Sequence, residues 1–232
     1  MRLEVFPIEG IPEVRAGDDL AGQIATACPD LRHGDVVVVT QKVVSKAEGA
    51  MARIDPQDPR GHKAIVEEES VRIVRRRGDL IISETKHGFI CANAGVDLSN
   101  VDEGWAALLP ADSDRSARRI RDGLRARLGV DVAVIVSDTF GRPWRRGLTD
   151  VAIGCAGIRA VVDLRGTEDS RGRELQVTEV CVVDELAGAA ELVMGKASGV
   201  AAAVVRGVDP AWLGRGEVRA EVVRPPGEDL FR

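Results

Sequence analysis

Three short stretches of this sequence end an apolar run with polar side chains. They are TQKVVSKAEG at 40–49, CANAGVDLSN at 91–100 and SDTFGRPWRRG at 137–147. Asp97 and Asp138 supply carboxylates there, and Thr139 supplies a hydroxyl. Oxygen ligands of this kind suit Mg²⁺ or Mn²⁺, and magnesium needs only one or two carboxylates when phosphates complete its shell. The three stretches together favour a metal site, although each acid by itself is equally typical of a residue that caps a turn.

Cations accompany the acids. The third stretch places Arg142, Trp144, Arg145 and Arg146 within eight residues of Asp138, although the net charge of the chain is -5. The planar guanidinium fork fits carboxylates and phosphates, so an anionic ligand is the simplest explanation of the cluster. The alternative is an arginine-rich loop that pairs with acids of a partner subunit. Lys46, in the first stretch, could likewise neutralise a phosphate.

The familiar nucleotide signatures do not account for such a site. No G-x-G-x-x-G follows an expected strand. The closest approach to a phosphate loop is AELVMGKAS at 190–198, where Gly195 and Lys196 resemble the end of the motif. Ala190 stands in place of the first glycine, and the stretch follows an expected helix rather than a strand. A nucleotide would therefore have to bind through another architecture.

Composition limits the class of protein. The chain has 232 residues, 44% of them apolar and 30% charged, as in soluble globular domains, and with 3% aromatics its core must be aliphatic. No apolar run reaches the ~20 residues of a membrane helix, and the N-terminus lacks a signal-peptide layout. The mild acidic balance argues against a nucleic-acid partner. We expect a cytoplasmic protein whose four cysteines are buried reduced thiols: Cys28, Cys91, Cys155 and Cys181.

The hydrophobic pattern mixes strands and helices. Strands are expected at 3–8, at the start of 35–47, and at 79–84, 88–93, 130–138, 149–158, 160–166 and 199–207. Helices are expected at 18–28 with Asp18 as the N-cap, at 61–77 with Gly78 at the end, at 112–128 and at 182–196. Four consecutive valines at 36–39 indicate a strand covered on both faces. The pattern predicts an α+β fold with a large mixed sheet, with room for two lobes.

The three quoted stretches, in this order, resemble the coenzyme F420-0:L-glutamate ligase (CofE) family, in which the third runs on as SDTFGRPWRRGLTDVAIGCAG. VFPIEGIPEV and LVMGKASGVAAAVVRG match as well. The resemblance covers nearly the whole chain and implies a single ligase domain over 1–232. The same domain forms the first part of a fused actinobacterial ligase whose second domain resembles a nitroreductase. We expect no such second domain here, because the sequence stops at Arg232.

The resemblance implies a reaction. The family joins L-glutamate to the lactyl carboxylate of F420-0 and then adds further γ-linked glutamates, with GTP as co-substrate, Mg²⁺ or Mn²⁺, and K⁺ as a possible additional cation. A carboxylate is a poor electrophile, and GTP would convert it to an acyl phosphate that the amine attacks. Metals between phosphate oxygens stabilise developing charge in such transfers. The family also implies a two-lobed homodimer with the site near the subunit interface.

The resemblance further implies the residues of the site. Asp97 and Asp138 would hold the first metal and Thr139 the second. The nucleotide would contact Ile11, Pro12, Glu13, Val14, Thr40, Gln41, Lys46, Asn100, Gly195 and Lys196. Asp138 and Lys46 are the candidate catalytic residues. Residue type alone adds Trp144, to stack on the deazaflavin ring or to anchor the core, and three cations for the phosphodiester or glutamate carboxylates: Arg142, Arg145 and Arg146.

Two other functions remain open at this stage. A paralogous ligase could use the same GTP and metal residues on a different carboxylate acceptor. A nucleotide-binding regulatory module is the non-enzymatic alternative. Asp97, Asp138 and Thr139 are all present, which favours an enzyme, because a degenerate binder would be expected to lose a metal ligand. Neither the number of glutamates added nor the preference for GTP over ATP can be read from residue types.

Overall fold

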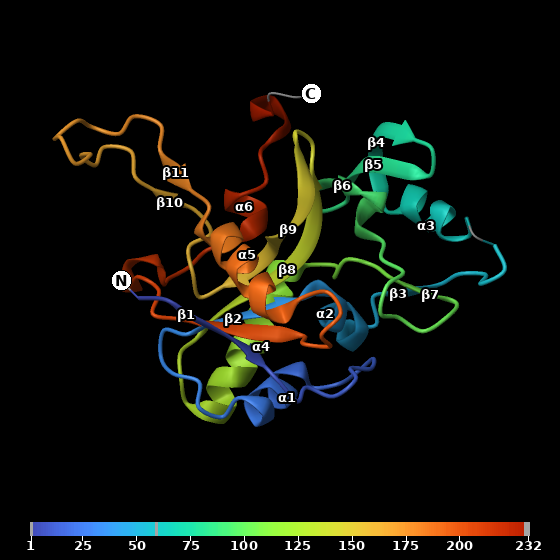
Figure 1. Ribbon diagram of the computed structural model, residues 1–232, viewed down its shortest axis with the longest axis horizontal. Helices are drawn as coiled ribbons and strands as arrows, with labels where there is room; N and C mark the ends of the chain where they lie inside the picture. The colour runs from blue at the N-terminus through green and yellow to red at the C-terminus, as the bar shows by residue number, and fades with distance from the viewer. Residues whose placement is uncertain (1, 59, 230–232) are drawn as a thin grey trace.

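The computed structural model describes residues 2–58 and 60–229, and it confirms the expected α+β class (Figure 1). The strands are β1 Glu4–Ile8, β2 Val36–Thr40, β3 Met51–Arg53, β4 Ser70–Arg77, β5 Leu80–Thr85, β6 Ile90–Ala92, β7 Trp105–Ala107, β8 Ala133–Arg142, β9 Arg145–Ala156, β10 Val162–Asp163, β11 Glu179–Val180 and β12 Ala202–Arg206. The α-helices are α1 Leu20–Ala27, α2 Gln41–Glu48, α3 His62–Glu68, α4 Ser113–Leu128, α5 Val182–Met194 and α6 Val218–Glu221. Short 3-10 helices are η1 Asn93–Gly95, η2 Pro210–Trp212 and η3 Pro226–Glu228.

A five-stranded mixed sheet forms the centre of the molecule (Figure 1). Its strand order is β1-β12-β2-β8-β9, with β2 and β8 parallel and the other neighbours antiparallel. The parallel pair aligns Thr40 with Ser137, so the carboxyl ends of these two strands lie side by side. Strands β8 and β9 then continue past the end of β2 as a two-stranded hairpin. Polar residues that follow β2 and the equivalent point of β8 therefore meet at one edge of the sheet.

Both faces of the sheet are covered, as the valine run predicts. Val37 and Val39 pack in a cluster with residues of α1 and α4, whereas Val36 and Val38 pack in a second cluster with residues of α5. All four valines are fully buried. Successive side chains of a strand point to opposite faces, so a strand between two helical layers needs apolar residues at every position. The result is a three-layer arrangement in which helices lie on either side of the sheet (Figure 1).

A smaller antiparallel sheet, β4-β5-β6, lies beside the central sheet with α3 and η1 (Figure 1). Here the expected helix at 61–77 is wrong, because α3 ends at Glu68 and β4 occupies Ser70–Arg77. The segment SVRIVRRR is rich in β-branched residues and pairs with β5 across a two-residue turn at Gly78 and Asp79. Gly78, with φ +58°, thus closes a hairpin rather than a helix. The division into two lobes and the homodimer stay predictions.

The third polar stretch is also not the loop that the sequence suggests. The strand expected at 130–138 continues to Arg142, and β9 begins at Arg145 rather than at 149. Only Pro143 and Trp144 separate the two strands, because Arg142 pairs directly with Arg145. The polar composition of 137–147 suggested a loop. A hairpin that extends beyond the helical layers is exposed to solvent, so its strands do not need the apolar residues that mark a buried strand.

Other expectations are met with shifted boundaries. The helix expected at 112–128 is α4, in which Asp112 accepts a hydrogen bond from the Arg115 amide at 2.9 Å. The N-cap of α1 is Asp19 rather than Asp18. The strand expected at 160–166 is reduced to β10, and the stretch 35–47 changes from strand to helix after Thr40. All four cysteines are free; Cys181 is only partly buried. None of the described helices is long and apolar enough to cross a membrane.

Candidate active site

The predicted metal and nucleotide residues gather around the shared end of β2 and β8. Thr40 ends β2, and Gln41 begins α2 directly after it. Asp138 and Thr139 follow Ser137, the last residue of β8 that pairs with β2. Because side chains alternate along a strand, Asp138 points to the face covered by α4, as Val136 does, and Thr139 points to the face covered by α5, as Ile135 does. The site thus has two parts, one on each face of β8.

Asp97 belongs to the first part. A β-bridge to Ala107 fixes its backbone, and its carboxylate accepts hydrogen bonds from the Lys42 ammonium at 2.8 Å and from the Ser99 amide at 2.7 Å. Lys42 also donates to the Ser99 hydroxyl at 2.7 Å. Burial raises the pKa of Asp97, but the hydrogen bonds from Lys42 and Ser99 outweigh burial, so the pKa lies below its usual value. Asp97 is therefore ionised at neutral pH.

Asp138 has the opposite electrostatic character. Burial raises its pKa to about 7; the hydrogen bond from the Thr139 amide opposes this shift, while the charges of Asp97 and Asp150 add to it. Asp97 and Asp138 therefore lie close enough to repel each other. Burial and the Asp138 charge also raise the pKa of the Cys91 thiol to about 12, which makes this neighbouring cysteine a poor nucleophile. A carboxyl that is half-protonated at neutral pH beside an ionised one is an environment that a cation would stabilise.

The second part of the site centres on Asp150, which stands opposite Thr139 on β9. Its side chain is buried, and its carboxylate accepts hydrogen bonds from the Thr139 hydroxyl at 2.6 Å, the Ser137 hydroxyl at 3.1 Å and the Lys196 ammonium at 2.8 Å. Lys196 also contacts the Thr139 hydroxyl and pairs with Glu191 at 3.1 Å. The structure thus joins Thr139, a predicted metal ligand, to Lys196, a predicted nucleotide residue.

Two further nucleotide candidates meet at the other end of α2. Lys46 pairs with Glu13 at 2.5 Å, which brings the segment 11–14 next to the helix. Glu48, the acid nearest to Lys46 in the sequence, instead accepts a hydrogen bond from the Ser116 hydroxyl at 2.7 Å. The pair leaves the Lys46 side chain largely buried and the Glu13 side chain exposed. Val14 is buried in the core, whereas Pro12 is exposed.

The remaining nucleotide candidates differ in what their side chains contact. Gln41 is buried, and its amide donates to the Ser45 hydroxyl at 2.6 Å and to the Leu108 carbonyl at 2.7 Å. Asn100 is exposed in a left-handed conformation with φ +52°, three residues after Asp97. Gly195 follows α5 with φ +62°, so a turn places Lys196 over β9. Nucleotide contact by these residues stays a prediction.

The arginines and Trp144 lie at the tip of the β8–β9 hairpin. All are exposed, and Arg142 donates to the Arg146 carbonyl at 3.2 Å. Four residues of extended strand separate Arg142 from Asp138, or about 13 Å along the backbone. An arginine side chain reaches back over part of that distance, so a large ligand could contact both the tip and the acids. Core anchoring, the alternative role of Trp144, is excluded, because the side chain is 78% exposed.

Sequence reasoning missed two residues of this arrangement. Lys42 lies within the first quoted stretch, but nothing in those ten residues indicates that it pairs with an acid 55 positions away. Asp150 lies just after the third stretch, in GLTDVAIG, where an acid before an apolar strand resembles an ordinary strand start. The strand register would have revealed it, because Asp150 pairs with Thr139 across the hairpin.

The arrangement fits a divalent cation. Beyond burial, the charges of Asp97 and Asp150 raise the pKa of Asp138, while Lys42 pairs with Asp97 and Lys196 pairs with Asp150. Within residues 2–58 and 60–229, no three acidic, histidine or cysteine side chains lie close enough to hold a metal ion by themselves. A magnesium-type site would need phosphate oxygens and waters to complete the shell of one or two carboxylates, and metal binding here stays a prediction.

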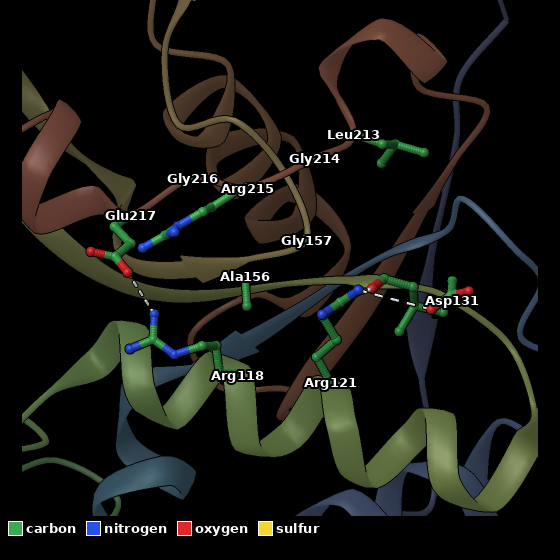
Figure 2. Close-up of a pocket in the computed structure, with 11 residues that line it drawn as sticks. Arg118, Arg121, Asp131, Ala156, Gly157, Leu213, Gly214, Arg215, Gly216 and Glu217 are labelled. Atoms are coloured by element: carbon green, nitrogen blue, oxygen red, sulfur yellow. Dashed lines mark hydrogen bonds and ion pairs between the residues drawn. The ribbon is translucent and has the colours of Figure 1, made fainter.

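A groove of about 790 Å³ lies elsewhere, between α4 and the segment 213–217 (Figure 2). Arg118 on α4 pairs with Glu217 at 2.8 Å across it, and Arg121 reaches Asp131 at 3.8 Å. None of the predicted site residues lines this groove. Its ion pairs join α4 to the loops around it, so we assign it a structural role.

Fold and site together describe an α+β enzyme that gathers acids, hydroxyls and lysines where two parallel strands end. The sequence profile of F420-0:Gamma-glutamyl ligase matches residues 10–207. A protein of Methanopyrus kandleri named coenzyme F420:L-glutamate ligase is 45% identical over all of this chain and 98% of its own length. Proteins of the same name from Methanothermobacter thermautotrophicus and Archaeoglobus fulgidus are 43% and 41% identical, each over all of this chain and over 100% and 97% of their own lengths. The chain belongs to the F420-0:gamma-glutamyl ligase family.

Proposed function

We propose that this protein joins L-glutamate to coenzyme F420-0 through an amide bond, using GTP and a divalent metal, and then adds further γ-linked glutamates. The observation that carries the proposal is the end-to-end match to curated proteins named for this activity. The paired acids and lysines at the end of β2 and β8 support it. An amide ligase must hold several anions together, and this site combines acids for a metal with cations for phosphates.

The reaction follows from the poor reactivity of a carboxylate. The F420-0 carboxylate attacks the γ-phosphate of GTP, GDP leaves, and an acyl phosphate forms. The amine of glutamate attacks the acyl carbon. The bond between that carbon and the bridging phosphate oxygen breaks, and inorganic phosphate leaves with the electron pair. The amine loses a proton in the process. No covalent link to the protein is required, which agrees with the raised pKa of the nearby Cys91 thiol.

Asp97 and Asp138 would hold one Mg²⁺ or Mn²⁺ and Thr139 a second, and these ions would supply positive charge to phosphate oxygens during the transfer. Lys42 holds Asp97 in place, and the Thr139 amide holds Asp138. Lys46 would bind a phosphate, for which it would exchange its exposed partner Glu13. Lys46 is largely buried and Glu13 is exposed, so the exchange would release Glu13 to water and leave the Lys46 ammonium paired with a phosphate.

The hairpin tip would bind the anionic acceptor. Arg142, Arg145 and Arg146 are exposed on the same hairpin that carries Asp138 and Thr139. An acceptor with a phosphodiester and a carboxylate needs cations at more than one point, and guanidinium groups suit both anions. We further propose that the protein acts as a cytoplasmic homodimer in which the projecting hairpins lie near the subunit interface.

The decisive experiment is incubation of the purified protein with F420-0, L-glutamate, GTP and Mn²⁺, followed by mass analysis. We expect products heavier by one or more glutamyl residues, and none without GTP or metal. Asp138→Asn should remove most of the activity. Glu168→Gln, at an exposed acid in the β10–β11 connection, is the control and should leave activity unchanged.

The rival functions give different results in the same assay. A paralogous ligase would consume GTP with another carboxylate but leave F420-0 unchanged. A regulatory module would bind GTP without any amide product. Replacement of GTP by ATP in parallel reactions measures the nucleotide preference.

A further inference from the structure

Asp150 is the most buried acid of the site and has three donors. Its side chain is 2% exposed, and Ser137, Thr139 and Lys196 all donate to it. A buried carboxylate is costly unless hydrogen bonds satisfy it, and here two hydroxyls and one ammonium do so. One oxygen, Oδ1, accepts from both Thr139 and Lys196, while Oδ2 accepts from Ser137. Oδ1 alone therefore accepts the hydrogen bonds from Thr139 and Lys196, the two donors that belong to the proposed site.

The donors come from separate parts of the chain. Thr139 stands on β8 directly opposite Asp150, whereas Lys196 arrives from the turn after α5. Helix α5 is held against β9 at the same level, because Asp184 accepts a hydrogen bond from the Ala152 amide at 2.9 Å. A Cβ built at Gly188 would lie 3.8 Å from the Asp150 carbonyl, an ordinary contact distance, so this part of α5 is the neighbour of Asp150. Asp150 thus stands where three elements meet.

The Asp150 carboxylate helps to orient two of its donors, Lys196 and Thr139. A lysine has a long side chain and loses much rotamer freedom when it is fixed. Lys196 is half-exposed, and it is oriented by ion pairs with Asp150 and Glu191 and by its hydrogen bond to the Thr139 hydroxyl. The Thr139 hydroxyl donates to Asp150 and accepts from Lys196, which leaves one lone pair for another partner.

We propose that Asp150 is a positioning residue of the ligase site: it fixes the Thr139 hydroxyl and the Lys196 ammonium so that both act on the phosphate end of the nucleotide. The proposal rests on the proposed function, because it needs a nucleotide at this site. Asp150 itself does not touch the reacting atoms. Asp150 would act on the nucleotide only through Thr139 and Lys196. An experiment that combines substitutions can therefore distinguish this role from that of an ion pair that only stabilises the fold.

The test is a double-mutant cycle on GTP affinity, measured by calorimetric titration in the presence of Mn²⁺. We expect Asp150→Asn to weaken GTP binding about tenfold and Lys196→Met to weaken it by a similar factor. If Asp150 acts through Lys196 and Thr139, the double variant should be at most about threefold weaker than Lys196→Met alone. Independent effects would instead multiply to about a hundredfold.

Ser137→Ala is the matched control. It removes a hydrogen bond to the other oxygen of the same carboxylate and should leave GTP affinity within twofold of wild type. Circular dichroism and thermal melts establish that each variant is folded. Asp150→Ser, which is smaller and keeps a hydroxyl, takes the place of Asp150→Asn if that variant does not fold, with the same expectation.

The outcomes separate the two proposals. GTP affinity of a folded Asp150→Asn within twofold of wild type, or multiplicative losses in the double variant, would overturn the positioning role and leave the ligase function standing. Absence of GTP binding by the wild-type protein would overturn the GTP-dependent function and the positioning role together. A Ser137→Ala loss equal to that of Asp150→Asn would show that the carboxylate serves the fold alone.

Discussion

Replacement of Arg206 tests whether the stability of the sheet can be separated from the chemistry of the site. Arg206 ends β12 and forms a two-pronged ion pair with Asp35, with Nε–Oδ1 at 2.8 Å and Nη2–Oδ2 at 2.7 Å. Asp35 is 1% exposed and also accepts a hydrogen bond from the Arg32 amide at 2.8 Å. The pair lies at the start of β2, at the opposite end of that strand from the candidate site.

The expected cost follows from the burial of the carboxylate. Arg206→Met keeps most of the side-chain volume but leaves Asp35 buried without its cation. Loss of one partner of a buried pair costs about 3–5 kcal/mol, most of it the penalty on the charge that remains. For a chain of this size each kcal/mol lowers the melting temperature by about 2–4 °C. The variant should therefore melt about 6–20 °C below wild type.

Thermal and urea unfolding, followed by circular dichroism, measure this loss. Arg2→Met is the control, because the Arg2–Glu4 pair is exposed and should contribute at most ~1 kcal/mol. Asp35→Asn in the Arg206→Met background should recover about 1 kcal/mol or more, since it removes the unpaired charge. A loss below about 1 kcal/mol for Arg206→Met would refute this account. So would a double variant less stable than Arg206→Met alone.

Three further predictions concern the site. Asp138 has a pKa of about 7 in the folded protein against an ordinary value of 3.8, so the metal-free folded protein binds this proton more tightly than the unfolded chain does. The wild-type protein should therefore lose stability relative to Asp138→Asn as the pH rises from about 4 through 7. Urea unfolding at each pH measures this difference. Equal pH profiles would contradict it. Lys46→Ala should weaken GTP binding in a titration by ~1.5–3 kcal/mol, the range for a charged hydrogen bond, whereas the control Lys86→Ala should leave GTP affinity unchanged. Unchanged affinity of Lys46→Ala would mean that Lys46 only forms the ion pair with Glu13. Arg145→Ala should raise the KM for F420-0 or glutamate more than that for GTP and leave the proposed dimer intact. A variant that is monomeric in sedimentation where wild type is dimeric, with unchanged KM values, would make the tip an interface element.

The sequence by itself determined the class of the fold, its core and the family. The valine run at 36–39 specified a strand covered on both faces, because alternation would otherwise expose every second side chain. Asp112 and Gly129 mark both ends of α4 through local hydrogen bonding and a left-handed glycine. Local signals of this kind can be read because the residues that make the interaction are close in the chain, although Asp18 and Gly78 were assigned to the wrong cap and the wrong turn. The long motifs around Asp97 and Asp138 identified the family for a similar reason, since their residues follow one another directly.

Only the tertiary structure decided which charged groups meet. The helical reading of Ser70–Arg77 failed because pairing with β5, not local propensity, set the conformation of that segment. Lys42 reaches Asp97, Lys46 reaches Glu13 and Lys196 reaches Asp150 across separations of 55, 33 and 46 residues. Nothing in the sequence encodes such pairs locally. They depend on the parallel alignment of β2 with β8 and on the register of the β8–β9 hairpin, which are set by burial of the whole sheet between its two helical layers.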